Sequence, residues 1–351
     1  MVPGRNSGGR RVVAPPVWVG SVVRTPHFGL VAVILSLGTF LTLMAGTRED
    51  RITGQVVNNF LNPGTLVQIA TDTSFFAILA VGVAIVILSG GIDLSVGSTY
   101  ALAGVGSALL LRSWDASAWP PALAALALIG VSLSIGAAAG LANGAMVVGL
   151  RVHPFVITLG MMWVYRGIAF VTSKAESILT PPGVTEIVKS SLGLRADLYP
   201  IPFLAMLLAT FAAMLFLSRT VAGRNVYAVG GNAEASYVSG IRIPRVLIGV
   251  YGLCGLAAGL AAFLGASYYG ATNCIDATGY ELYAIASAVV GGVSLSGGRG
   301  SVFGAVLGAL LIVLIRQAIL TLRLDRDYEW IIIGLAIVVA VSLERLSRGS
   351  R

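Results

Sequence analysis

Residues 87–98 read ILSGGIDLSVGS and place one carboxylate, Asp93, in a run that is otherwise apolar or small. Glycine tolerates backbone angles that other residues avoid, so Gly90 and Gly91 predict that a helix ends here. Asp93 and Ser95 are then expected to cap the next helix by accepting hydrogen bonds from its free backbone N–H groups. The stretch therefore predicts a break between two helices. The surrounding sequence decides whether that break lies in water or within a membrane.

The composition indicates a membrane protein. Of the 351 residues, 56% are hydrophobic and 11% are charged, whereas about 25% of a typical soluble domain is charged. Apolar runs near or above about 18 residues recur along the chain, which is typical of a polytopic helical membrane protein. The runs are continuous rather than alternating, which argues against a β-barrel. The 44 glycines fit a bundle in which helix backbones approach closely.

We expect an all-α polytopic membrane protein with broken helices near its glycine-rich loops. About ten transmembrane helices are predicted from the apolar runs, at residues 28–45, 66–89, 98–111, 121–142, 154–173, 200–218, 246–269, 282–298, 301–321 and 330–343. The arginines and lysines between these runs are more numerous on one side, which places both termini in the cytoplasm.

The domain organisation is predicted to be simple. Residues 1–27 are basic and rich in Pro and Gly, and they are expected to form a disordered cytoplasmic arm. Residues 28–345 would form a single transmembrane domain, and residues 346–351 a cytoplasmic tail. The longest loops, about 174–199 outside and about 219–245 inside, are too short to hold a catalytic domain.

Several kinds of chemistry are disfavoured. Cys254 and Cys274 are expected to be unpaired thiols, and His27 and His153 stand alone, so no metal site is predicted. The net charge of +8 comes from arginines between apolar runs, which favours a topological role over nucleic-acid binding. No Walker motif is present, so any ATP is expected to bind a partner subunit. No arrangement typical of an intramembrane enzyme appears.

Two readings of the opening stretch remain open on the residues alone. Irregular backbone at membrane depth persists only where protein or a water-filled cavity surrounds it, and a buried carboxylate by default marks a pathway or a partner. One reading is therefore a re-entrant break beside a translocation path, formed by Gly90, Gly91, Asp93, Ser95 and Ser98. The other reading is an interhelical cap at the cytoplasmic surface.

A second glycine-rich stretch resembles the first. Residues 291–301 read GGVSLSGGRGS, follow an apolar run as residues 90–98 do, and precede another helix of small residues. An ancient duplication and chance similarity both explain the likeness. The residues of interest in this predicted cytoplasmic loop are Gly291, Gly292, Ser294, Gly297, Gly298 and Arg299.

The inside loop at about 219–245 carries a helix signal. Asn232 is a plausible N-cap for the segment AEASYV, and Gly240 a plausible stop. The short helix could dock into another protein or form a solvated connector.

Arg166 in MMWVYRGIAF is flanked by Trp163 and Tyr165. It suits either a sugar pathway or anchoring of the helix at the outer membrane interface.

Together these blocks resemble the permease subunits of ribose-type monosaccharide ABC importers, which depend on a binding protein. The resemblance rests on SGGIDLSVGS (89–98), NGAMVVGLRVHPFVITLG (143–160), YRGIAF (165–170), GRNVYAVGGNAEASYVSGI (223–241) and TGYELYAIASAVVGGVSLSGGRGSVFGAVLGALL (278–311). The blocks occur in the same order over about residues 60–345. The segment AEASYVSGI departs from the AEAARLSGI that is commoner in that family.

The resemblance implies a non-enzymatic subunit in a bacterial cytoplasmic membrane, with lipid around it. Its implied partners are an ABC ATPase subunit that binds the ATP, an extracytoplasmic sugar-binding protein, and a second permease copy or paralogue. It also implies a translocation path near the helix break, to which we assign Phe155 and Arg166 as well. The implied contact with the ATPase is the inside loop, at Gly231, Asn232, Glu234, Ser239 and Gly240.

Two alternatives stay open at this point. One is a permease of the same family with a non-sugar ligand, such as a branched-chain amino acid. The other is a self-sufficient channel or secondary transporter, which is expected to need several intramembrane acids. Asp72 and Asp93 are the acids near the predicted span interiors, and both lie close to span ends. The resemblance does not select the sugar or an identical partner permease.

Overall fold

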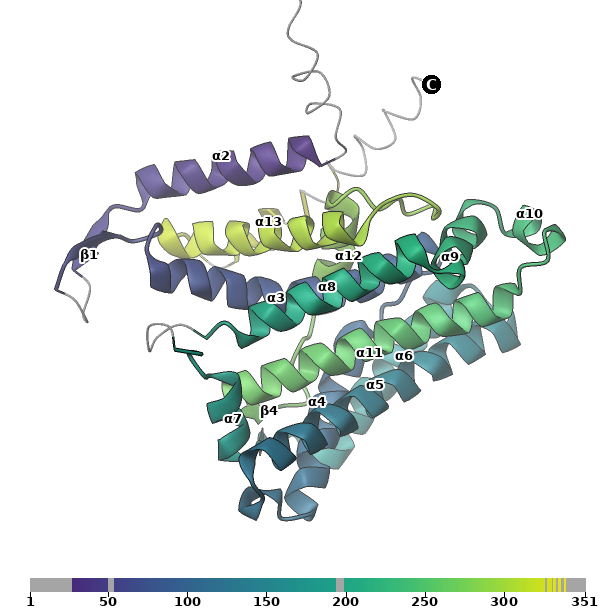
Figure 1. Cartoon of the computed structure of the whole chain (residues 1–351), viewed down its shortest axis with the longest axis horizontal. Coiled ribbons are helices and arrows are strands. Elements are labelled where there is room, and N and C mark those ends of the chain that lie inside the picture. The colour runs from purple at the N-terminus through teal and green to yellow at the C-terminus, as the bar shows by residue number, and fades with distance from the viewer. Residues whose placement is uncertain are drawn as a thin grey trace, which may run out of the picture.

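The computed structural model describes residues 27–49, 54–193, 199–325, 327–329, 331–332, 334–335 and 338. Over these residues the chain is mostly helical, and the long helices run side by side across the molecule (Figure 1). The elements, in chain order, are α2 (Phe28–Met44), β1 (Thr47–Glu49), β2 (Val56–Asn58), α3 (Pro63–Leu88), α4 (Val96–Ser113), the 3-10 turn η1 (Ala116–Ala118), α5 (Pro121–Leu150), α6 (Pro154–Ser173), β3 (Ile178–Leu179), α7 (Pro182–Val188), α8 (Ile201–Arg219), α9 (Val221–Gly231), α10 (Ala233–Val238), α11 (Ile243–Tyr269), β4 (Ala271–Thr272), α12 (Tyr280–Val290) and α13 (Val302–Thr321).

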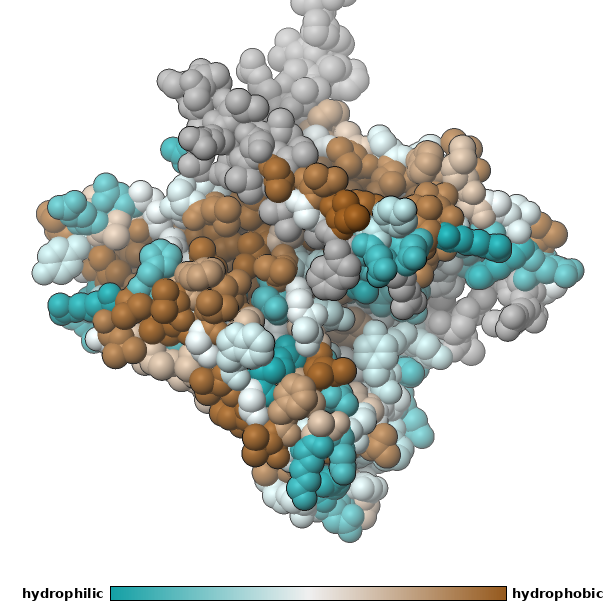
Figure 2. Space-filling model, turned by 180° about the vertical axis from the view of Figure 1, so that it is seen from behind, coloured by the Kyte–Doolittle hydropathy of each residue, from teal (hydrophilic) through white to brown (hydrophobic). Residues whose placement is uncertain are grey.

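Within the described residues, 6 helices are long and apolar enough to cross a membrane, namely α3, α5, α6, α8, α11 and α13. Helices α2 and α12 are apolar but shorter. These helices make the chain a multi-pass membrane protein. The space-filling view agrees, because hydrophobic side chains cover wide areas of the face that it shows (Figure 2).

The predicted span at 282–298 differs from the structure. Helix α12 ends at Val290 and has 11 residues, which reach about 16 Å at 1.5 Å per residue. That is about half of the 30 Å hydrocarbon core. The helix ends early because Gly291 and Gly292 follow it, so residues 291–301 form a loop. Most of the predicted span at 330–343 lies outside the described residues.

Helix α3 forms the centre of the bundle. In its most apolar window 94% of the residues are buried, against 17% for α6 and 22% for α8. The central helix packs against α8, α11, α12 and α13. Helices α6 and α8 therefore lie at the periphery, where their apolar side chains are open to lipid.

Helices α5 and α11 make the closest pair, and small residues at every fourth position explain it. Gly136 and Gly140 on α5 lie against Gly255 and the backbone near it on α11, with no room for a Cβ atom. The Ser132 hydroxyl also donates to the Gly259 carbonyl at 2.8 Å. Such spacing lets two helix backbones touch, as in small-xxx-small membrane pairs.

Both long polar segments contain structure that the sequence did not indicate. In the outer segment, β3 pairs antiparallel with β4, Ile178 opposite Thr272, and α7 follows. The segment expected to be an inside loop at 219–245 is instead mostly helical. Helix α9 begins there because the Thr220 hydroxyl caps it, accepting from the Gly223 N–H at 2.9 Å, and Val226 and Val229 bury its apolar side.

Candidate translocation and coupling site

The break predicted from the opening stretch is present between α3 and α4. Helix α3 ends at Leu88, and Gly90 follows in a left-handed conformation with φ +86°. The Gly90 N–H donates to the Ile87 carbonyl at 2.9 Å and the Gly91 N–H to the Val86 carbonyl at 3.0 Å. This is the Schellman pattern, in which a glycine ends a helix without a steric penalty.

Asp93 lies in the break and is 2% exposed. Its Oδ1 atom accepts from the Ser95 N–H at 2.8 Å and from the Ser95 hydroxyl at 2.7 Å. Asp93 thus satisfies the N–H of the residue that precedes α4. The expectation that Ser95 caps α4 through its side chain is wrong, because its hydroxyl is turned to Asp93 and makes no cap bond.

The Ser95 hydroxyl extends this contact into a buried polar network. It accepts from the Asn143 amide of α5 at 2.7 Å, and the Tyr165 hydroxyl of α6 donates to Asn143 at 3.0 Å. The Tyr251 hydroxyl of α11 donates to the Ile92 carbonyl at 3.1 Å. Neutral groups from three helices therefore hold the break inside the protein, and this burial favours the reading of an internal break over a surface cap.

Two further members of the predicted path occupy different places. Ser98 is buried one turn into α4 and donates to the Ser95 carbonyl at 2.8 Å. Phe155 is 44% exposed in the first turn of α6. The structure therefore brings Ser98 to the break and leaves Phe155 on the surface.

Three segments that are far apart in the sequence meet at the end of α3. The Gly298 N–H donates to the Leu88 carbonyl at 2.9 Å. Gly230, in the last turn of α9, leaves no room for a Cβ atom, which would collide with the Leu88 oxygen and lie 2.7 Å from the Gly298 nitrogen. A Cβ atom on Gly297 would lie 3.0 Å from the Cα atoms of Gly90 and Gly230. We call Leu88, Gly90, Gly230, Gly297 and Gly298 the glycine junction.

The likeness between the two glycine-rich stretches extends to their backbone. Gly292 ends α12 with φ +89°. Its N–H donates to the Val289 carbonyl at 2.9 Å, and the Val293 N–H donates to the Ala288 carbonyl at 2.9 Å. Gly292 thus has the same place after α12 that Gly90 has after α3. The backbone therefore pairs Gly90 with Gly292, whereas the sequence comparison pairs it with Gly291.

The rest of the 291–301 loop supports the junction. The Ser294 N–H donates to the Arg299 carbonyl at 2.9 Å, which closes the loop upon itself. Gly291 lies directly against Gly304 of α13. The Tyr227 hydroxyl of α9 donates to the Gly300 carbonyl at 3.1 Å, so α9 holds this loop in two places.

The short helix predicted after Asn232 is confirmed as α10. The Asn232 side chain accepts from the Ala235 N–H at 2.9 Å. Gly240 ends the helix with φ +83°, and the Ile241 N–H donates to the Ser236 carbonyl at 3.0 Å. Helix α10 projects from one end of the molecule (Figure 1), with Gly231, Glu234 and Ser239 exposed.

The tip of α10 exposes large side chains. Tyr237 is 73% exposed and Val238 is 81% exposed. They take the place of the Arg-Leu pair that is commoner in the resembled family. Helix α10 connects through Asn232 and Gly231 to α9. The single short helix α9 therefore links α10 to the glycine junction.

Arg166 lies in the second half of α6. Its Nη1 atom donates to the carbonyls of Cys274 and Asp276, both at 2.6 Å. Arg166 therefore fastens α6 to the loop that follows β4. Arg166 lies about two turns along α6 from Thr158, whose hydroxyl reaches the Ile92 carbonyl at 3.2 Å. The loop that Arg166 holds borders the first turn of α4, because a Cβ atom on Gly97 would lie 2.5 Å from the Ala277 oxygen. The structure therefore places Arg166 near the start of α4 and not among the groups that bond Asp93.

The sequence did not reveal a polar cavity of about 270 Å³ beside the first half of α3. Helices α3, α11, α12 and α13 supply its lining, which comprises Gln68, Asp72, Phe75, Phe76, Tyr269, Tyr280, Val313, Arg316, Gln317 and Leu320. The Gln68 amide donates to the Asp72 carboxylate at 2.9 Å. The spacing of four residues between Gln68 and Asp72 could have indicated a polar site, because it puts both side chains on one face of a helix.

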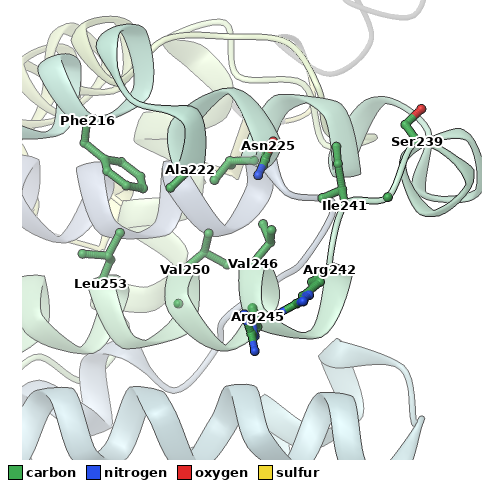
Figure 3. A pocket seen from close by; sticks show the side chains of 13 residues that line it. Phe216, Ala222, Asn225, Ser239, Ile241, Arg242, Arg245, Val246, Val250 and Leu253 are labelled. Atoms are coloured by element: carbon green, nitrogen blue, oxygen red, sulfur yellow. The ribbon is translucent and has the colours of Figure 1, made fainter.

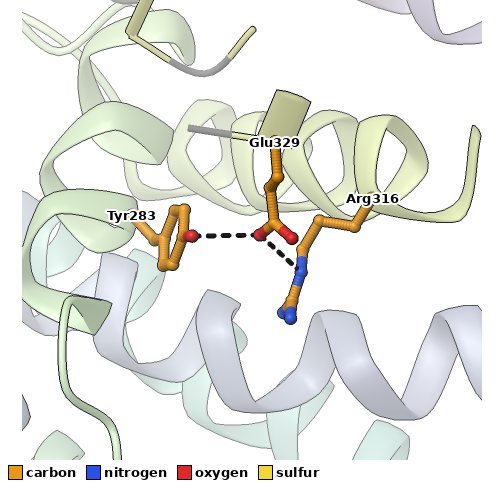
Figure 4. Close-up of polar contacts among 3 residues, drawn as sticks. All are labelled: Tyr283, Arg316 and Glu329. Carbon is orange, nitrogen blue, oxygen red and sulfur yellow. Dashed lines mark hydrogen bonds and ion pairs between the residues drawn. The ribbon is translucent and has the colours of Figure 1, made fainter. Parts of the chain in front are cut away.

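Arg316 is held in place beside this cavity (Figure 4). Its Nε atom pairs with the Glu329 carboxylate at 2.9 Å, and the Tyr283 hydroxyl donates to the same oxygen at 2.9 Å. The guanidinium also lies over the Phe76 ring, 5.2 Å from its centroid. Carboxylate, amide, guanidinium and aromatic groups around one cavity can bond hydroxyl groups and stack on an apolar face.

Metal or disulfide chemistry has no visible place among the described residues. No group of three His, Cys, Asp or Glu residues lies close enough to hold a metal ion. Cys254 and Cys274 are free and buried, as the sequence predicted. Cys254 is a neighbour of Asp93 and lies beside the polar network around the break.

Comparison with known proteins gives a consistent picture. Residues 65–341 match the model of a family described as "branched-chain amino acid transport system / permease component". In Escherichia coli, the D-allose transport system permease is 36% identical over 82% of this chain and 85% of its own length, and the ribose import permease is 36% identical over 82% and 87%. The galactose/methyl galactoside import permease is 37% identical over 82% and 88%. No solved structure matches.

Proposed function

Because this chain belongs to the branched-chain amino acid transport system permease family, we propose that it is the transmembrane subunit of an ATP-driven, binding-protein-dependent monosaccharide importer. The family description names amino acids, but the curated relatives described above carry sugar names. That agreement is the observation on which the sugar class rests. A ribose-like pentose, a hexose or a related polyol is the expected cargo.

The proposed topology has about ten spans in a bacterial cytoplasmic membrane, with both termini inside. Helices α2 and α4 and the segment 330–343 would add to the six long apolar helices. Helix α12 is too short to span alone and would complete the tenth crossing together with the loop that precedes it. In this orientation α10 and the glycine junction face the cytoplasm, and the loop after β4 faces outward. Lipid would surround the peripheral helices α6 and α8.

We expect a separate ATPase subunit to bind the ATP and to dock on α10. The projection of α10, with Tyr237 and Val238 exposed, supports this role. Closure of the ATPase pair would move α9, and the glycine junction would pass that movement to the break. Coupling of this kind requires that the ATPase bind one state of the permease more tightly than the other. The chain itself would need no cofactor and would not act as an enzyme or bind nucleic acid.

Two other partners complete the proposal. An extracytoplasmic sugar-binding protein would deliver the cargo at the outer face, where Ile275 is 60% exposed in the loop held by Arg166. A second permease, identical or paralogous, would pair with this chain. No chemistry would be done on the sugar.

The polar cavity beside Arg316 is the proposed place where the sugar first contacts this subunit. Its Asp72 and Gln68 side chains offer hydrogen-bonding groups, and Phe75 and Tyr280 offer ring faces. Replacing a group that bonds a sugar hydroxyl should reduce the uptake of the native sugar at unchanged ATPase docking. We expect Gln68→Ala and Gln317→Ala to lower the uptake rate about tenfold, since each lost hydrogen bond is worth about 1 kcal/mol or more.

The partner experiment is a pull-down of the tagged full-length chain from gently solubilised native membranes, followed by mass spectrometry. An ATPase subunit and a sugar-binding protein in the eluate would support the importer. If the chain elutes alone or with itself only, under conditions that preserve other importer complexes, the proposal fails and a stand-alone channel must be considered. The co-purified binding protein then identifies the sugar by a thermal-shift screen.

A further inference from the structure

A long groove runs between α8 and α11 on the face of the bundle, and only its end at the α10–α11 turn adjoins residues assigned to the ATPase contact. Its first part is a cavity of about 610 Å³ lined by α8, α9, the α10–α11 turn and α11. Its second part is a cavity of about 430 Å³ lined by α3, α5, α8 and α11. Phe216 and Leu253 line both parts, so the two cavities adjoin.

The two parts differ in chemistry. The second part is lined by aliphatic side chains, phenylalanine, alanine and glycine alone, among them Ile78, Ala213 and Leu260. The first part is also mainly apolar, but its lining includes Asn225 and Ser239, and at its end nearest α10 it carries Arg242 and Arg245 (Figure 3). The groove is thus cationic at one end and mainly apolar along the rest.

The two arginines lie at a helix N-terminus, where a positive charge is least favourable. Arg242 is the N-cap of α11 and Arg245 is in the first turn, which contains no acidic residue. The N-terminus of a helix carries a partial positive charge, so it favours anions over cations. Both arginines are exposed, and within the described part of the chain neither has an ion pair or side-chain hydrogen bond. This end of the groove therefore attracts an anion.

The length of the groove fits one leaflet of a bilayer. Along α11 it extends from Arg245 to Leu260, which is about 22 Å at 1.5 Å per residue. One leaflet, headgroups included, is about 20–22 Å thick. A phosphate at Arg245 would therefore place an acyl chain along the apolar part of the groove.

We propose that this groove binds one anionic phospholipid, with its phosphate at Arg242 and Arg245 and an acyl chain between α8 and α11. Basic pockets between membrane helices on the cytoplasmic side are typical headgroup sites. Because Ser239, Gly240 and Ile241 also line the groove, the lipid contacts the turn that connects α10 to α11. A lipid bound in the groove therefore helps to hold α10 in place.

The test is native mass spectrometry of the purified full-length chain, titrated with phosphatidylglycerol or phosphatidylcholine of the same acyl chains. The wild type is expected to retain one phosphatidylglycerol in preference to phosphatidylcholine. Arg242→Gln with Arg245→Gln should weaken phosphatidylglycerol retention about 30-fold, taking about 1 kcal/mol for each arginine. The matched control is Arg224→Gln, an exposed arginine of α9 that does not line the groove.

A second variant tests the apolar part independently of charge. Gly249 lines the groove and has open space where a Cβ atom would be, so Gly249→Phe is expected to direct its ring into the groove. Retention of both lipids at this site should be lost in Gly249→Phe and kept in Gly149→Phe, an equally open position on α5. Equal retention of the two lipids by the wild type, or unchanged retention in either groove variant, would overturn the proposal.

Discussion

At the scale of single residues, Asp93 shows how a carboxylate can be buried without a cation. Its oxygen is bonded by the backbone and hydroxyl of Ser95, and Asn143 and Tyr165 complete the chain of donors. Buried polar groups remain favourable only while each is bonded. The side chain therefore organises the break through its neighbours, and the stability of the break depends on all of them.

Asp93→Leu should destabilise the protein more than Asp93→Asn. Leucine leaves the Ser95 N–H and hydroxyl without their acceptor, which costs about 1–3 kcal/mol, whereas asparagine keeps an acceptor oxygen in the same place. The measurement is the unfolding of the purified variants in one detergent, followed by circular dichroism. If Asp93→Leu proved as stable as the wild type, the network would not hold the break.

Gly230 and Gly231 form a matched pair for testing the glycine junction. A Cβ atom on Gly230 collides with the Leu88 carbonyl, while a Cβ atom on Gly231 has nothing within 4 Å. We expect Gly230→Ala to lower stability by about 1–3 kcal/mol, as overpacking does, and to reduce transport. Gly231→Ala should leave the stability unchanged. Equal behaviour of the two variants in thermal unfolding would refute the close packing of the junction.

Residue roles were predictable from the sequence where they depend on neighbours along the chain. Asn232 as an N-cap and Gly240 as a stop depend on residues within one turn, and both were predicted. The Ser95 side chain was expected to cap α4, but it bonds Asp93 and accepts from Asn143 on another helix. A local pattern contains no information on that competing partner.

At the scale of elements, α10 is a short helix that contributes little to the core. It buries Ser236 and exposes Glu234, Tyr237 and Val238. A six-residue helix is not stable alone in water, so its caps and its connections to α9 and α11 hold it in place. An element with so little burial and such well-formed ends is suited to contact a partner.

Glu234→Arg should abolish most ATP-driven uptake without preventing membrane insertion. The reversed charge places a cation on the exposed first turn of α10, where it would disturb docking and oppose the helix dipole by less than about 1 kcal/mol. Uptake and ATPase co-purification would be measured in the same membranes. Glu176→Arg is the control, because Glu176 is exposed beyond the opposite end of the bundle. Normal uptake by Glu234→Arg would remove α10 from the coupling role.

The sequence predicted the long helices well and the short ones poorly. Apolar runs gave α3, α6, α8 and α11 because a membrane span needs a continuous run. Helix α9 was missed because its buried side consists of Gly223, Val226 and Val229, which is too few apolar side chains for a recognisable pattern. Helix α12 was predicted too long because Val293 and Leu295 continue the apolar run past the glycines that end the helix.

At the scale of the whole molecule, the structure connects the proposed docking helix to the break in the core. Helix α10 joins α9, α9 packs at Gly230 against the end of α3, and the Gly298 N–H bonds Leu88. Neither this junction nor the cavity with Asp72 and Arg316 was predictable. Each brings together segments from distant parts of the sequence, which only the packing of the bundle defines.

The most direct test of the account is ATP-driven uptake by the complete complex in proteoliposomes. This chain would be reconstituted with its co-purified ATPase and binding protein, and accumulation of the radiolabelled monosaccharide that the binding protein selects would be measured. The account predicts accumulation against a gradient that requires both ATP and the binding protein and is lost with Glu234→Arg. Uptake that runs only down the gradient and is indifferent to ATP would contradict it.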